Sequence, residues 1–349
     1  MATAATPQSP VHVEAPDNGV DDAEVPVPVF RAILYSCDEP ARILDIDELA
    51  GTTVHDDQLL WVALCAPDAE LVAKVAQALA LPEPVPHSMS RLDSAPTLQD
   101  AGTWFVVQVI AARLRKDMRF DGQVISVACG VNVIVTVTDM ACAFIDDLYQ
   151  RQHRNTMLGA LNAESFVVSL IDGQLASYFD AMSRLEAEVD RVEVRLLADH
   201  EGDYIQLLRV LRTASSRLRR TLAGHRFVFG YMVRPDFRPK QSRQLNEHFA
   251  ALQARYERCM DLVEHGRDLV LGSFELFTTR AAMSTNETMR VLTFVTVLIG
   301  GLAVVVGVLG MNFAAPFFDT GARGFWTAVA SMVLLAMLAL GVGRYRRWL

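Results

Sequence analysis

Asn312 is a polar residue placed at the end of an apolar run. About 20 residues without a charged side chain precede it, and Gly310 and Met311 come directly before it. An Asn side chain carries an oxygen acceptor and an amide donor. Such a group can cap the carboxyl end of a helix at a membrane surface. It can also face inward and hydrogen-bond an ion that keeps its water shell.

Two apolar runs surround this position and predict membrane-spanning helices. The first extends from Val291 to Gly310 and the second from Phe325 to Gly343. A helix of about 20 residues is about 30 Å long, which matches the hydrocarbon core of a bilayer. Because a short segment joins the runs, we expect a transmembrane hairpin over residues 291–349, in contact with the lipid bilayer.

The charges that flank the hairpin predict its orientation. Arg290 precedes the first run, and Arg344, Arg346 and Arg347 follow the second. Basic residues stay on the cytoplasmic side of a membrane. We therefore expect a multi-pass protein of the cell inner membrane, with both termini in the cytoplasm.

The composition of the remaining chain agrees with a cytoplasmic location. Residues 1–28 lack the basic start and apolar core of a signal peptide, and their Pro, Ala and acidic content is typical of a disordered tail. The five cysteines are scattered, without a Cys-x-x-Cys pair, so we expect them to be reduced and mostly buried. With a net charge of −9, no nucleic-acid partner is expected.

Residues 29–160 have the pattern of an α/β domain. Strand-like runs alternate with helical stretches, of which the clearest follows Asp68, a predicted helix cap. No phosphate-binding glycine loop, nucleophile elbow or metalloprotease motif is present. We therefore expect a structural or regulatory domain and not an enzyme. The strand-like runs are VFRAILYS, LLWVALC, TWFVVQVIAARL, QVISVACG and VNVIVTVT.

Residues 161–290 have the pattern of a long helical stalk. Apolar residues recur there at three- and four-residue spacing between Glu and Arg. The last stalk helix begins near Ser242 and meets no proline before Pro316, so it could continue into the first span as one helix of about 68 residues and roughly 100 Å. The positions where this helix could bend are Gly266, Gly272, Ser284 and Thr285.

The first apolar run carries small residues that favour helix association. Glycine and alanine allow neighbouring membrane helices to approach closely. Since two spans per chain cannot enclose a pore, we expect a homo-oligomer. A membrane-tethered helical scaffold fits the same periodicity and stays open at this point. The small residues are Gly300, Gly301, Ala303 and Gly307.

The C-terminal region resembles the CorA family of divalent metal ion transporters, to which the ZntB branch also belongs. The resemblance depends on Gly310, Met311 and Asn312 at the end of the first span. It extends to Asn286-Glu287 and Leu292-Thr293 at the membrane entry, and to the basic ending that closes with Trp348-Leu349. Earlier segments follow the order of the family's strands and stalk, but they are less specific.

The resemblance implies a homopentameric, channel-like transporter for divalent cations, with magnesium as the main ion and cobalt or nickel as further candidates. No cofactor is expected beyond the cation itself. Gly310, Met311 and Asn312 would form the selectivity filter. Because magnesium loses water reluctantly, the Asn312 amides and Gly310 carbonyls would contact the hydrated ion.

The resemblance also implies a pore-lining stripe on the first span. Its positions are three or four residues apart, so they share one face of a helix. Leu292 and Met289 could form a hydrophobic constriction that closes by dewetting, although ordinary helix packing explains them as well. The stripe consists of Gly307, Ala303, Gly300, Thr296, Leu292 and Met289.

Regulation by cytoplasmic metal is a further implication of the resemblance. Glu275 matches one carboxylate of the family's regulatory site, and Asp93 or Asp100 could supply the other, because His87 and Ser88 stand where acids are expected. Glu275 could equally be a solvated charge of the stalk. The basic ring at the cytoplasmic mouth would comprise Arg344, Arg346 and Arg347.

The loop after Asn312 leaves the identity of the metal open. It keeps Pro316 but offers one acid, Asp319, partly offset by Arg323, where many members carry an acidic segment. A ZntB-like zinc transporter is therefore the alternative. The eight histidines form no His-x-x-x-His pair, so no site of soft ligands favours zinc.

Overall fold

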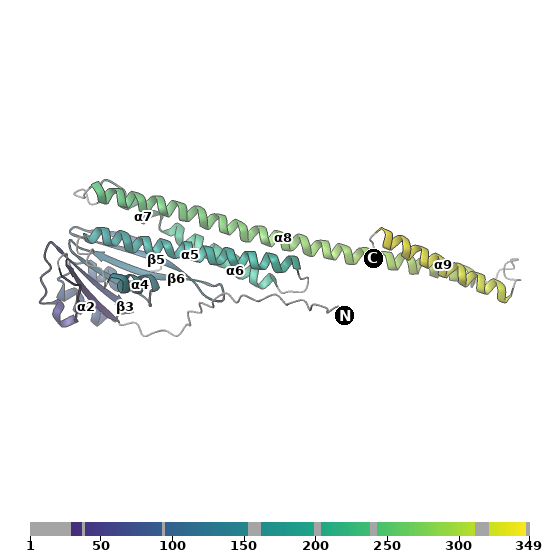
Figure 1. Cartoon of the computed structure of the whole chain (residues 1–349), viewed down its shortest axis with the longest axis horizontal. Coiled ribbons are helices and arrows are strands. Elements are labelled where there is room, and N and C mark those ends of the chain that lie inside the picture. Colours follow the sequence, from purple (N-terminus) through teal and green to yellow (C-terminus); the bar gives the residue numbers. More distant parts are fainter. Residues whose placement is uncertain are drawn as a thin grey trace, which may run out of the picture. The chain divides into compact units, whose positions relative to one another are not determined.

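The computed structural model describes residues 29–36, 39–92, 95–152, 162–198, 204–237, 243–310 and 321–346 (Figure 1). By packing, these residues form two compact units. The first contains the residues up to Ser183 and Ser216–Val263, and the second contains Arg184–Ser215 and the residues from Glu264. The long helices belong to both units, and the boundaries predicted at residues 160 and 290 stay a prediction.

A seven-stranded mixed sheet forms the centre of the first unit. Its strand order is β2-β1-β3-β7-β6-β5-β4, with β3 and β7 parallel and all other pairs antiparallel. The five predicted strands are confirmed. The two outermost strands, β2 and β4, were not predicted because they are short and partly polar. The strands are β1 Phe30–Ser36, β2 Arg42–Leu44, β3 Gln58–Cys65, β4 Thr97–Ala101, β5 Trp104–Leu114, β6 Phe120–Cys129 and β7 Val133–Thr138.

The helices follow the predicted order, and the predicted cap is confirmed. Asp68 accepts a hydrogen bond from the backbone N–H of Leu71 at 2.7 Å, which satisfies a free donor at the start of α2. The structure also contains the expected α/β domain, the long helix and the two apolar C-terminal helices. The helices are α1 Ile46–Leu49, α2 Ala69–Ala78, α3 Val85–Ser90, α4 Ala143–Gln152, α5 Ala163–Ala198, α6 Tyr204–Gly224, α7 Arg226–Met232, α8 Arg243–Leu309 and α9 Ala322–Tyr345.

One face of the sheet packs against α2 and α3. Val62 and Val135 on the sheet share a buried cluster with Val72 and Val75 of α2 and with Met89 of α3. The strands alternate inward and outward side chains, so the neighbouring residues face the other side. Both faces are apolar, and both must be covered.

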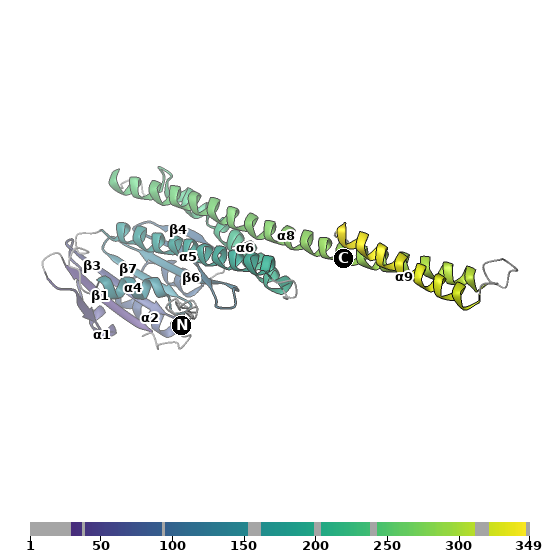
Figure 2. The same cartoon turned by 45° about the vertical axis from the view of Figure 1, so that its right-hand side comes forward.

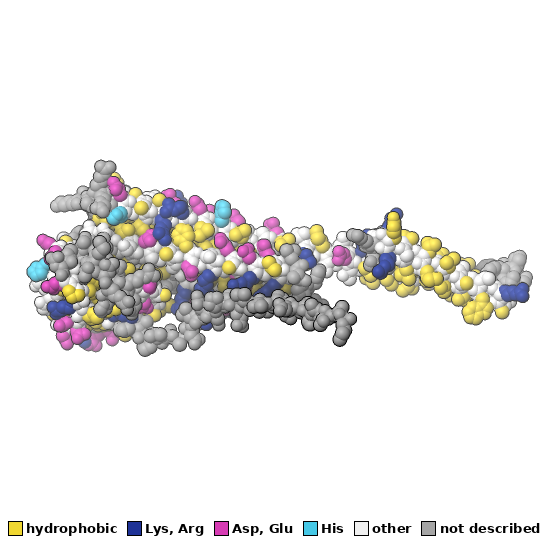
Figure 3. Space-filling view, in the orientation of Figure 1, with side chains coloured by type: hydrophobic (Ala, Val, Ile, Leu, Met, Phe, Trp, Pro, Cys, Tyr) yellow, Lys and Arg dark blue, Asp and Glu magenta, His cyan; other side chains and the backbone are white. Residues whose placement is uncertain are grey.

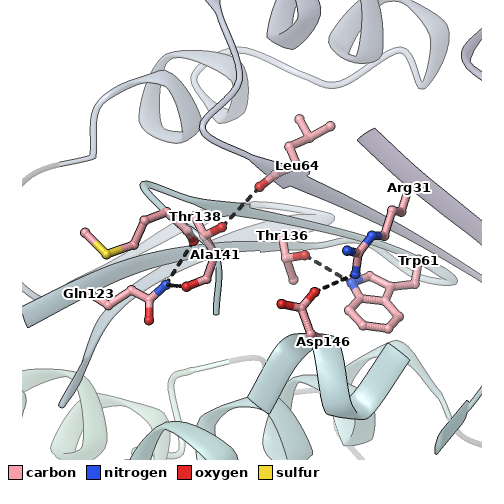
Figure 4. Close-up of polar contacts among 9 residues, drawn as sticks. Arg31, Trp61, Leu64, Gln123, Thr136, Thr138, Ala141 and Asp146 are labelled. Carbon is pink, nitrogen blue, oxygen red and sulfur yellow. Dashed lines mark hydrogen bonds and ion pairs between the residues drawn. The ribbon is translucent and has the colours of Figure 1, made fainter. Parts of the chain in front are cut away.

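Trp61 organises the opposite face of the sheet. Its indole N–H donates to the Thr136 hydroxyl at 3.1 Å, and its ring meets the edge of Phe166, at the start of α5, at 5.0 Å between centroids. Beside it, Arg31 of β1 forms an ion pair of 2.6 Å with Asp146 of α4 (Figure 4). The Trp61 indole needs the Thr136 hydroxyl as its acceptor, because a buried N–H without a hydrogen bond costs free energy.

Helix α8 is continuous over 67 residues, close to the expected length. The sequence positions considered for bends, Gly266, Gly272 and residues 284–285, all lie within the helix. Its buried residues recur at four- and three-residue spacing, which is the seam of a coiled coil. Beyond Ser273 no described residue of α8 is buried. The buried positions are Leu245, Phe249, Leu252, Tyr256, Cys259, Val263, Gly266, Val270 and Ser273.

The stalk helices dock on a free edge of β5 through polar side chains. Strand β4 pairs with β5 only as far as Gln108, so the backbone of Ile110 has no strand partner on that side. The Ile110 N–H donates to His225 Nε2 at 2.9 Å. The Ile110 carbonyl accepts from Gln174 at 2.7 Å and from the Tyr178 hydroxyl at 3.0 Å. Side chains of α5 and of the α6–α7 junction thus replace a strand.

The contacts of His225 determine its protonation state. Because Nε2 accepts from the backbone N–H of Ile110, the proton sits on Nδ1, which donates to the Thr221 carbonyl at 2.9 Å. Burial lowers the pKa of His225 to about 4. A second proton would place two N–H groups against each other. His225 is therefore neutral in the folded protein near pH 7.

The pKa of His225 predicts a loss of stability on acidification. Since the folded pKa lies below the usual value of 6.5, the unfolded chain binds more protons below pH 6.5. The contribution of neutral His225 to the free energy of unfolding is therefore fully present above pH 6.5. It is lost as the pH falls toward 4, by about 3 kcal/mol in all. Melting temperatures of the purified chain at pH 7 and pH 5 measure this effect.

We expect His225→Gln to lower the melting temperature at pH 7 and to flatten the pH dependence. His55→Gln, at an exposed position, is the matched control and should behave as the parent. An unchanged pH dependence in His225→Gln would show that another group is responsible.

Candidate functional site

Helices α8 and α9 contain the two predicted spans. Each contains an apolar stretch that is unburied within the chain, with mean hydropathy 2.6 in α8 and 2.2 in α9. The two helices lie side by side in both views (Figures 1 and 2). Hydrophobic side chains cover the hairpin, and Lys or Arg side chains mark its two ends (Figure 3). By length and composition, both helices are candidates to cross a membrane.

One face of each helix is partly covered in the hairpin. On α9 the covered residues are mostly small and lie at four- and three-residue spacing, which lets the helices approach. On α8 they are larger. The covered residues of α8 are Phe294, Leu298, Leu302 and Leu309, and those of α9 include Gly324, Ala328, Met332, Ala336, Ala339 and Gly343.

The predicted pore-lining stripe lies on the other side of α8. At 100° per residue, its positions centre on the side opposite Phe294, Leu298 and Leu302. Every residue of the stripe is exposed, with Met289 at 60% and Leu292 at 64%. A Cβ atom added at Gly300 or Gly307 would meet nothing within 4 Å. Packing within this chain therefore does not account for the small residues of the stripe.

Thr296 is the polar member of the described stripe. Its hydroxyl donates to the backbone carbonyl of Leu292 at 2.8 Å, within the helix. Thr293 does the same toward Met289 at 2.7 Å. This bond fixes the hydroxyl proton and leaves the lone pairs of the Thr296 oxygen available to a water or hydrated ion.

Only part of the predicted filter lies in the described structure. Gly310 ends the helix, and its N–H bonds to the Val306 carbonyl at 2.9 Å. Met311 and Asn312 lie outside the described residues, as does Arg347. The assignment of the filter therefore stays a prediction based on sequence.

The predicted regulatory residues are not brought together within the described structure. Glu275 is exposed on α8, and Asp93 lies outside the described residues. The alternative Asp100 accepts from the backbone N–H of Gly102 at 3.0 Å and so supports the turn between β4 and β5. In the described part of the chain, no group of three His, Cys, Asp or Glu side chains could hold a metal ion. Arg344 and Arg346 are exposed at the end of α9.

The structure adds a hollow that the sequence-based prediction missed. It has a volume of about 370 Å³ and lies beside the predicted constriction, on the flank of α8 between the exposed stripe and the face toward α9. All of its lining residues belong to α8, so the hollow is an open groove along one helix, and helical spacing could have grouped these residues. The lining residues are Asn286, Met289, Arg290, Thr293, Phe294 and Val297.

Comparison with known proteins settles the family. The model described as "CorA-like Mg2+ transporter protein" matches residues 56–342, which is more than half of the chain. The chain belongs to the CorA family. This confirms the resemblance noted in the sequence, and the description of the matching family model is that of a transporter.

Curated relatives are similar over part of their length. The cobalt/magnesium transport protein CorA of Thermotoga maritima is 26% identical over 187 residues, or 54% of this chain and 53% of the relative. The protein of the same name from Methanocaldococcus jannaschii is 23% identical over 173 residues, or 50% of this chain and 54% of the relative. The matches thus span about half the length of each relative.

Solved structures share the fold over most of the chain. The complete CorA magnesium transporter of Methanocaldococcus jannaschii has a TM-score of 0.73 at 18% identity, covering 91% of this chain and 98% of its own. The full-length CmaX protein has a TM-score of 0.69 at 22% identity, with coverage of 91% and 97%. The ZntB cytoplasmic domain of Vibrio parahaemolyticus has a TM-score of 0.55 at 10% identity, covering 73% of this chain and 99% of its own. At these identities the likeness concerns the fold.

Proposed function

We propose that the chain is a homopentameric, channel-like transporter of divalent cations, with magnesium as its main ion and α8 lining the pore. The observation that carries this proposal is the exposed stripe of α8, which lies opposite the face toward α9. A stripe with small residues and one hydroxyl is a poor lipid-facing surface, but it suits a shared axis. The printed names of the relatives, cobalt/magnesium transport proteins, agree with these ions.

The proposed filter would bind the ion through its water shell. Magnesium requires six ligands at short distance and releases water reluctantly. A ring of Asn312 amides would accept hydrogen bonds from these waters, and Gly310 carbonyls would add a second ring of acceptors. Cobalt and nickel hold similar hydration shells, so we expect them to pass as well.

The lower stripe would form the gate. Leu292 and Met289 are large, apolar and exposed in the single chain, so copies placed around an axis would point them at one another. A narrow apolar ring expels water and stops ions without a physical plug. Above it, Gly300, Ala303 and Gly307 would leave a wider passage.

The proposed orientation places Arg290, Arg344 and Arg346 on the cytoplasmic side of the cell inner membrane, together with both termini. Arg290 begins the apolar part of α8, and the other two end α9. In an antiparallel hairpin these ends meet at the same membrane surface. With Arg347, they would form the basic ring around the inner mouth.

Cytoplasmic metal would regulate the channel. The chain carries a net charge of −9, and carboxylates brought together by assembly repel one another unless cations lie between them. Glu275 is exposed on α8 and available for such a contact, with Asp93 of a neighbouring copy as the proposed second ligand. Bound magnesium would then hold the pore shut.

Zinc transport of the ZntB type is the second candidate, because the soluble domain shares the fold of a ZntB cytoplasmic domain. The described thiols do not favour it. Burial raises the pKa of Cys142 and of Cys259 to about 12, and among the described residues no group of three His, Cys, Asp or Glu side chains could hold a metal ion. Magnesium therefore stays the first choice.

The filter is tested by ion uptake into proteoliposomes. We expect magnesium, cobalt and nickel to enter faster than zinc, and Asn312→Ala to reduce uptake by about tenfold or more because the acceptor ring is lost. Leu334→Ala, at an exposed position of α9, is the control and should transport as the parent does. Normal transport by Asn312→Ala would disprove the pore assignment.

The stripe is tested by a bulky substitution. Ala303→Phe should block uptake, because the added ring would project toward the proposed axis. Leu338→Phe on α9, also at an exposed position, adds a ring that would face lipid and should leave uptake within about twofold. Equal uptake by both variants would mean that the stripe does not line a pore.

Regulation is tested by patch recording. Removal of magnesium from the cytoplasmic face should raise the open probability, and Glu275→Ala should weaken the inhibition by magnesium. Asp261→Ala, another exposed acid of α8, serves as the control. An open probability that does not respond to cytoplasmic magnesium would argue against metal gating.

A further inference from the structure

Helix α6 and the two residues that follow it, His225 and Arg226, form a strongly basic segment in an acidic chain. Between Tyr204 and Pro235 the sequence contains no Asp or Glu, although the whole chain has a net charge of −9. This segment therefore cannot neutralise its own charge. The basic face of α6 comprises Arg209, Arg212, Arg217, Arg219 and Arg220, and Arg226 at the start of α7 extends it.

The arginines lie on the outer side of α6. All six are exposed, whereas the buried residues Leu208, Leu211, Leu218 and Leu222 occupy the other side. Spacings of three and seven residues place several of the arginines in one row along the helix. Lys and Arg side chains gather in such a row in the space-filling view (Figure 3). The helix thus presents a fixed array of positive charge.

Most of this charge has no acidic partner within the described structure. Arg209, Arg212, Arg217 and Arg220 form no ion pair with any described Asp or Glu. Like charges three and four residues apart destabilise a helix. An anionic partner along this face would remove that repulsion.

The N-terminal segment of the same chain has the complementary charge. Residues 1–28 contain five carboxylates and no Lys or Arg. All five fall between Glu14 and Glu24, a stretch of about 35 Å when extended. The arginines of α6, from Arg209 to Arg220, span about 16 Å along the helix. The carboxylates are Glu14, Asp17, Asp21, Asp22 and Glu24.

The sheet register shows that this segment can reach α6. Phe30, where β1 begins, is aligned across the sheet with Gln108 of β5, through Leu64, Val137 and Ser126. Phe30 and Gln108 are four strand spacings apart, so the distance between them across the sheet is about 19 Å. Two residues farther along β5, the Ile110 N–H bonds to His225, which directly follows α6. The 16 residues from Phe30 back to Glu14 extend up to about 55 Å, which is more than sufficient.

We propose that the acidic segment from Glu14 to Glu24 docks on the basic face of α6. The contact is electrostatic, between carboxylates and guanidinium groups, so it weakens as salt increases. It does not depend on the proposed transport function, because it concerns only the domain outside the hairpin.

Zero-length crosslinking of the full chain tests the proposal. In a variant with Arg209→Lys, Arg212→Lys, Arg217→Lys and Arg220→Lys the charge is kept, and a carbodiimide joins a lysine amine to a carboxylate only where the two touch. Mass spectrometry should find links between residues 14–24 and residues 209–220. Their yield should fall by about fivefold or more at about 0.5 M salt. Replacing the five acids with Asn or Gln should abolish the links.

A matched variant controls for random encounters. It carries Lys at four exposed arginines elsewhere, and it should give few links to residues 14–24. Equal yields from the two variants, or α6 lysines linked to acids of a folded domain in place of the N-terminal segment, would overturn the proposal. The control positions are Arg42, Arg119, Arg234 and Arg267.

Trypsin cleavage supplies a second measurement that needs no change in α6. In the full chain, neutralising the five acids should speed cleavage after Arg217 and Arg220 by about threefold or more, because the docked segment would shield them. Cleavage after Arg42 should be unchanged. An unaltered rate at Arg217 and Arg220 would count against docking, even if the fourfold lysine variant failed to fold.

Discussion

The apolar surface of α8 is the constraint on which this structure depends. As far as Ser273 its apolar seam is buried against other helices of the same chain, and beyond that residue nothing on the helix is buried. The apolar side chains that follow cannot remain in water, because each exposed one costs free energy in proportion to its area. Such a surface requires an apolar surrounding, and the length and composition of the two helices suit a bilayer.

A second requirement, the satisfaction of backbone hydrogen bonds, holds the helices on the sheet. Strand β5 extends past its neighbour β4, and the free N–H and carbonyl of Ile110 bond to side chains from α5 and the α6–α7 junction. Ser177 adds a bond to the N–H of Ala112 at 2.8 Å. These contacts fix the orientation of α6, so its buried leucines face inward and its arginines face outward. The basic face is thus a consequence of how the sheet edge is completed.

Much of the fold could be predicted from local patterns. The five longer strands, the cap at Asp68 and the two spans each depend on residues close in sequence. Strands β2 and β4 were not predicted, because three to five partly polar residues are too few to show the alternation of apolar and polar side chains that is typical of a strand. The hydrogen bond between His225 and Ile110 joins residues 115 positions apart, and no local pattern indicates it. The Gly310-Met311-Asn312 motif was recognised in the sequence, and its assignment as a filter stays a prediction because Met311 and Asn312 lie outside the described residues.

The sequence by itself determined that the chain has two apolar segments of bilayer length, a basic C-terminal end and the residues typical of the CorA family, because length, charge and short motifs are properties of adjacent residues. Only the tertiary structure decided which face of α8 is covered by α9 and which stays exposed. It also decided that Arg209, Arg212, Arg217 and Arg220 of α6 form no ion pair with a described Asp or Glu. Such facts depend on the contacts between distant segments, and these form only when the chain packs.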